Sequence, residues 1–160
     1  MRVLLKRIIV ATTLGLAALP GLADVPDNRQ VLSLNELQRH HVLEEMRALL
    51  SGVQNILTAL AKDDMAAVAQ HARPLGMSMG KKAEDHLKGM LPREFMLLGM
   101  SVHQDFDKIA ADAESLKDSK HALGQLSNTM FKCVACHDAY QIRVEPKSAN
   151  QNGVAGHHAH

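Results

Sequence analysis

Residues 131–140 read FKCVACHDAY and contain the only two cysteines of the 160-residue chain, Cys133 and Cys136, with His137 directly after the second. Two thiols and an imidazole at this spacing suit three kinds of chemistry: a redox disulfide, part of a zinc site, or covalent attachment of a haem. Each chemistry requires a different fold around the motif. The residues that surround it therefore decide which one applies.

Apolar residues around this stretch recur every three or four positions, which is the period of an amphipathic helix. Residues at i, i+3 and i+4 share one side of a helix. Cys133 and His137 continue the apolar stripe and Cys136 lies one position beside it, so both thiols and the imidazole are expected to face the interior. The stripe consists of Leu123, Leu126, Met130, Cys133, His137 and Tyr140 in a helix that begins near Asp118.

Three earlier segments show the same period, and no convincing strand pattern appears in the sequence. Ser33 and Glu36 have the spacing of a capping box at the start of the first helix, and Pro92 fits the first position of the third. Four helices with one apolar face each predict an all-α fold, an antiparallel four-helix bundle. The earlier helices are expected within 33–60, 65–75 and 92–116, with a partly helical connection over 77–91.

Residues 1–23 are predicted to be a cleaved secretory signal peptide. Arg2, Lys6 and Arg7 precede an apolar run that is too short to cross a bilayer, so no membrane span is expected after cleavage. Residues 21–23, Gly-Leu-Ala, have the pattern of a cleavage site. The signal indicates export, and the periplasm is the expected location.

Residues 145–160 are polar and without period, which predicts a disordered tail. This tail contains three histidines that could bind a metal: His157, His158 and His160. The single predicted domain therefore covers residues 24–144.

Charge and composition narrow the choice of partners and cofactors. The predicted signal holds three of the 18 Lys and Arg and none of the 17 Asp and Glu, so the remaining chain is slightly acidic. No basic patch for nucleic acid is present. The chain is 46% hydrophobic but 2% aromatic and has no Trp. Because aromatic residues normally supply much of a small core, a large flat ligand would suit this one.

Haem attachment is the chemistry that uses every part of the motif. A structural zinc site needs four protein ligands, and the chain has no second cysteine pair. A thioredoxin-like disulfide needs a βαβ setting, whereas this motif lies late in an apparently helical chain. C-x-x-C-H at Cys133, Cys136 and His137 has the spacing of c-type haem attachment, which the exported location also suits.

With these features, residues 34–143 resemble the class II cytochromes c, the cytochrome c-prime family and its low-spin, methionine-ligated relatives. The late CVACHDAY and the first-helix stretch EEMRALLSGVQNIL carry the resemblance. It implies one covalently attached haem c. Cys133 and Cys136 match the thioether cysteines, His137 matches the proximal iron ligand, and Tyr140 matches an aromatic near the haem. The family often has Arg or Lys directly after this aromatic, where this chain has Gln141.

The resemblance places Met46 of the first helix at the sixth iron position. Ligation there gives a His/Met, six-coordinate iron. Two alternatives remain open: Met46 is a core residue in its apolar stripe, or His41 binds the iron instead. Without either ligand the iron is five-coordinate and open to gases such as nitric oxide or CO.

The expected function is a one-electron carrier of the periplasm, not an enzyme, with an unidentified redox partner and a possible homodimer through the first two helices. A gas-binding protein is the alternative, and a mainly structural haem in an accessory protein is a third. Other histidines, including His103, are expected to be exposed or singly hydrogen-bonded. Several methionines have helical spacing that fits either packing or the haem edge: Met77, Met79, Met90, Met96 and Met100.

Overall fold

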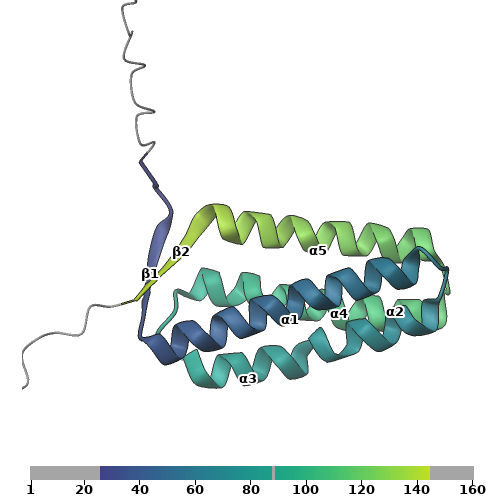
Figure 1. Cartoon of the computed structure of the whole chain (residues 1–160), viewed down its shortest axis with the longest axis horizontal. Coiled ribbons are helices and arrows are strands. Elements are labelled where there is room, and N and C mark those ends of the chain that lie inside the picture. Colours follow the sequence, from purple (N-terminus) through teal and green to yellow (C-terminus); the bar gives the residue numbers. More distant parts are fainter. Residues whose placement is uncertain (1–25, 88, 145–160) are drawn as a thin grey trace, which may run out of the picture.

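The computed structural model describes residues 26–87 and 89–144, so the predicted signal peptide and the tail from residue 145 lie outside the described residues. This part of the chain is mostly helical, as expected of an all-α fold, and its helices lie side by side along one long axis (Figure 1). No helix of the described residues is long and apolar enough to cross a membrane. The elements are β1 (Gln30–Leu34), α1 (Glu36–Leu60), α2 (Met65–Ala72), the 3₁₀ turn η1 (Arg73–Leu75), α3 (Met77–Leu87), α4 (Arg93–Ser115), α5 (Ser119–Ala139) and β2 (Tyr140–Val144).

The start of α1 differs from the prediction by two residues. Asn35 is the N-cap: its side chain accepts a hydrogen bond from the backbone of Gln38, and the Gln38 side chain accepts one from the backbone of Asn35. This reciprocal pair is a capping box. The expected box at Ser33 and Glu36 is wrong because Ser33 belongs to β1.

The second helical segment continues further than predicted. Asp64 caps α2 by accepting a hydrogen bond from the Ala67 backbone. Pro74 interrupts the helix as η1, and the chain resumes as α3 beyond Gly76, over much of the expected connection. Pro92 is the N-cap of α4 and not its first helical residue as predicted, because the helix begins one position later, at Arg93.

A two-stranded sheet corrects the expectation that the chain has no strands. β1 and β2 pair in parallel, with Gln30 opposite Tyr140 and Leu34 opposite Val144. Leu32 and Leu34 are buried, so β1 turns alternate side chains inward. The sheet joins the two ends of the described chain and lies at one end of the helices (Figure 1).

The exposed and buried faces of α5 are rotated by about one residue from the predicted stripe. Leu123 and Met130 are exposed, whereas Ala122 and Thr129 are buried. The small inward residues let α5 pack closely on α4, which leaves the larger apolar side chains outside. As a result Cys136 belongs to the inward-facing side of α5, and His137 lies next to that side.

The hydrophobic core is divided into two clusters along the helices. The larger contains Val53, Ile56, Phe106 and Leu126, and lies away from the sheet. The smaller contains Leu34, Val42 and Leu87 with Ile142 of β2 packed against it. On α1, Met46 packs against the smaller cluster and Leu49 against the larger. The stretch of α1 around Met46 therefore marks the boundary between the two clusters.

Candidate functional site

One cavity of about 430 Å³ is lined by all five residues that the sequence singled out. This volume falls within the range of ligand pockets in proteins. The cavity is bounded by α1, α3, α4, α5 and β2, so the fold brings together residues that are distant in the sequence. The five residues are Met46, Cys133, Cys136, His137 and Tyr140.

The two cysteines are free thiols on one side of α5, and each is half-buried. Burial raises the pKa of the Cys133 thiol, and the nearby Asp105 carboxylate raises it further. Burial also raises the pKa of the Cys136 thiol, with a smaller contribution from Cys133. Both thiols therefore stay protonated near neutral pH.

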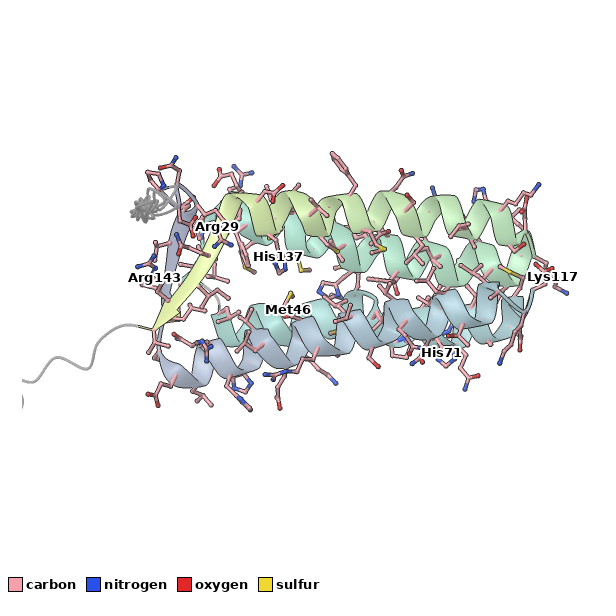
Figure 2. The ribbon with its side chains drawn as sticks, turned by 45° about the horizontal axis from the view of Figure 1, so that its top comes forward. Arg29, Met46, His71, Lys117, His137 and Arg143 are labelled. Carbon is pink, nitrogen blue, oxygen red and sulfur yellow. The ribbon has the colours of Figure 1, made fainter. Side chains whose placement is uncertain are left out.

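His137 and Met46 approach the cavity from different helices. His137 lies in the last turn of α5 and Met46 lies midway along α1. Figure 2 shows the two side chains on opposite sides of the space between these helices. His137 is exposed and Met46 is half-buried, although both line the cavity. The arrangement offers an imidazole from one side and a thioether from the other.

Tyr140 belongs to β2 and not to the last helix as predicted. The helix ends at Ala139, and Tyr140 is extended. Its ring meets Phe95 of α4 edge to face, with the ring centres 5.2 Å apart. Phe95 lines the same cavity. The two rings therefore form an aromatic wall close to the sheet.

Three cationic side chains surround the cavity, from α1, α5 and the segment before β1. Arg29 donates to the His137 carbonyl oxygen at 3.3 Å and forms an ion pair with Asp27. Lys132 is paired with Asp105, with 2.5 Å between Nζ and Oδ2. Arg39 lines the cavity two helical turns from Met46 on α1. Gln141 occupies the position at which the class II cytochromes c often have Arg or Lys. Its side chain donates a hydrogen bond to the Arg29 carbonyl oxygen.

His103 of α4 is a site residue that the sequence reasoning missed. It is 4% exposed and has two hydrogen-bond partners, whereas it was expected to be exposed or singly hydrogen-bonded. Its Nδ1 lies 2.7 Å from the Leu75 carbonyl oxygen and its Nε2 lies 2.9 Å from Glu45 Oε1. Because a carbonyl oxygen can only accept, Nδ1 is the donor to Leu75, and Nε2 faces the Glu45 carboxyl group. His103 thereby links α4 to the turn of α1 that carries Met46.

The pKa of His103 reflects two opposing effects. Burial lowers it, but the hydrogen bonds to Glu45 and to the Leu75 carbonyl oxygen outweigh burial, so the pKa is raised. A close neighbour also fixes the ring: a Cβ on Gly80 of α3 would lie 2.6 Å from His103 Cδ2. His103, Glu45 and Gly80 all line the cavity. No local sequence signal could reveal this group, because its members come from distant segments.

The alternative iron ligand, His41, lies in a different place. It lines a neighbouring cavity of about 290 Å³ that shares Glu45 and Leu87 with the larger one. Met96 and Met100 of α4 line the larger cavity, whereas Met79 lines the smaller. The structure thus places Met46, and not His41, in the cavity with the two cysteines.

Among residues 26–87 and 89–144, no three His, Cys, Asp or Glu side chains form a group that could hold a metal ion. A haem iron does not need such a group, because the porphyrin supplies four of its ligands. Searches for similar proteins found no matching family model, curated protein or solved structure. The functional conclusion therefore depends on the motif and on the cavity.

Proposed function

We propose that this protein is a periplasmic c-type cytochrome, a one-electron carrier built as a four-helix bundle with one covalently attached haem c. The observation that carries the proposal is that Cys133, Cys136, His137 and Met46 line one cavity. When bound, the haem supplies the Fe(III)/Fe(II) couple. The protein holds it, provides axial ligands and sets its surroundings.

The thiols suit covalent attachment. Cys133 and Cys136 are three residues apart on one helix and point to one cavity. Each protonated thiol would add across one vinyl group: its S–H bond and the C=C π bond break, one C–S and one C–H bond form, and there is no net oxidation or reduction. The two thioethers would tether the haem near the C-terminal end of α5, where both cysteines are only half-buried.

His137 of α5 and Met46 of α1 would hold the iron. His137 directly follows the second cysteine, so its imidazole lies beside the two thiols that would tether the haem. Met46 offers its thioether from the opposite helix, and His/Met ligation raises the reduction potential. The His103–Glu45 hydrogen bond holds the turn of α1 beside Met46, which limits rotation of that helix about its axis.

The cavity walls also fit a flat, largely apolar cofactor. Leucines, methionines and Phe95 dominate the lining, and Gly99 leaves room along α4, because a Cβ there would meet nothing within 4 Å. Arg39 would offset a carboxylate of a haem, whereas Arg29 and Lys132 line the same cavity but are already paired with Asp27 and Asp105. Leu32 of β1 and Ile142 of β2 add to the apolar lining, and an apolar surrounding favours the less charged iron state.

Optical spectra of the purified protein and of Met46→Ala test the assignment. We expect a low-spin wild type whose ferric form shows the weak long-wavelength band of iron–thioether ligation, and loss of this band in Met46→Ala. Met79→Ala is a matched control, because Met79 lines the neighbouring cavity. A high-spin wild type that binds CO readily would contradict Met46 ligation and favour the gas-binding function.

A further inference from the structure

The outward face of α5 carries an exposed apolar surface. Phe131 is 74% exposed and Val134 is 56% exposed, and Leu123 and Met130 are also exposed. Met130, Phe131 and Val134 follow Leu123 by seven, eight and eleven residues, which puts all four side chains on one face of the helix. Figure 1 shows α5 along the edge of the helices, so this face meets solvent. Contiguous apolar patches of this kind mark interaction surfaces.

Two oppositely charged side chains, Lys120 and Asp138, lie at the two ends of this surface. Lys120 and Asp138 are 18 residues apart, which is five helical turns, so they lie on the same side of α5 about 27 Å from each other. The charged residue between them, Lys132, is turned toward α4 and paired with Asp105. The surface from Lys120 to Asp138 is therefore uncharged along its outward centre.

Both charges oppose the dipole of their own helix. The first turn of α5 contains Lys120, and its last turn contains Asp138, whereas a helix favours the reverse arrangement. Within the described residues neither side chain forms an ion pair. Arg29 acts on Asp138 only at longer range, since its own ion pair is with Asp27. A partner with the opposite charge order would stabilise both ends at once.

We propose that two copies of this chain pair through α5, antiparallel, about a two-fold axis. A second copy in this orientation brings Lys120 next to Asp138 of the partner subunit, and the symmetry makes the same ion pair twice. Three of the four large apolar side chains then face a small residue. The facing pairs are Phe131 with Ser127 of the partner subunit, Val134 with Gly124 of the partner subunit, and Leu123 with Ala135 of the partner subunit.

The size of this surface sets the expected affinity. One helix from each copy gives an interface at or below the lower end of the roughly 1,200–2,000 Å² found in stable complexes. We therefore expect a dissociation constant in the micromolar range, with register fixed by the end charges. The pairing does not depend on the proposed haem, because it uses the face of α5 that points away from the cavity.

Analytical ultracentrifugation of the full-length protein as matured in the periplasm, across a micromolar concentration series, tests the pairing. Phe131→Glu places a charge at the centre and should raise the dissociation constant by more than about tenfold. Leu50→Glu is the matched control, because Leu50 is 69% exposed on α1. It also tests the competing dimer through the first two helices.

Charge reversal gives a second, independent test. Lys120→Glu and Asp138→Lys each bring like charges together across the interface and should weaken the dimer, and the double variant should restore it. Each reversal suits the dipole of α5, so neither should unfold the helix. A monomeric wild type, a dimer that survives Phe131→Glu, or a double variant without recovery would overturn the pairing. A monomer in which Phe131→Glu only slows electron transfer to another protein would also overturn it and assign the surface to that partner.

Discussion

Replacement of Gly80 by alanine tests the packing of α3 on His103. The added Cβ would lie 2.6 Å from His103 Cδ2 and 2.9 Å from Cγ, which is too close for any side chain. The ring cannot move aside without stretching its bonds to the Leu75 carbonyl and to Glu45. Overpacking costs about 1–3 kcal/mol, and a strained bond to a charged group adds to this cost. Alanine recovers up to about 1 kcal/mol of helix propensity, which leaves a net loss of about 2 kcal/mol.

Urea unfolding followed by circular dichroism measures this loss. Gly124→Ala is the control: a Cβ there meets nothing within 4 Å, so we expect a gain of up to about 1 kcal/mol in dilute, monomeric protein. A double-mutant cycle isolates the contact, since Gly80→Ala should cost little in a His103→Ala background. An unchanged cost in that background, or a Gly80→Ala protein as stable as the wild type, would refute the clash with His103.

Two further predictions concern stability. Asp118→Ala removes the side chain that accepts hydrogen bonds from the backbones of Lys120 and His121, and should lower the unfolding free energy by about 1 kcal/mol; an unchanged urea midpoint would contradict this cap. Because the folded pKa of His103 is raised, its contribution is complete below the unfolded value of about 6.5 and disappears as pH rises through the folded value. The stability difference between wild type and His103→Ala should therefore shrink with rising pH in urea titrations, and a difference that grows would show that the sign is wrong.

Local patterns in the sequence located most of the helices, although not every boundary. The last helix begins near Asp118 as predicted, and Asp118 is its N-cap, because a cap is a contact between near neighbours. The parallel pairing of β1 with β2 was missed, since it joins residues about 110 positions apart and each strand has only five residues. The face of α5 was misplaced because Ala122 and Thr129 are small and fit against α4 better than Leu123 or Met130.

The candidate site was only partly predictable. A spacing motif identified Cys133, Cys136 and His137, and a family resemblance pointed to Met46; the structure places all four at one cavity. The burial of His103 could not be foreseen, because one of its partners is a backbone carbonyl and the other lies 58 residues away. Such contacts depend on how helices pack and leave no mark on local sequence.

The mass of the intact protein tests the central claim most directly. Wild-type protein produced with a haem-attachment system should be heavier than its polypeptide by one haem, and should keep this mass and its colour after denaturation. The Cys133→Ala, Cys136→Ala double variant should lose the covalent haem. A colourless wild type with the mass of the bare polypeptide would contradict the assignment of residues 133–137 as a haem attachment site.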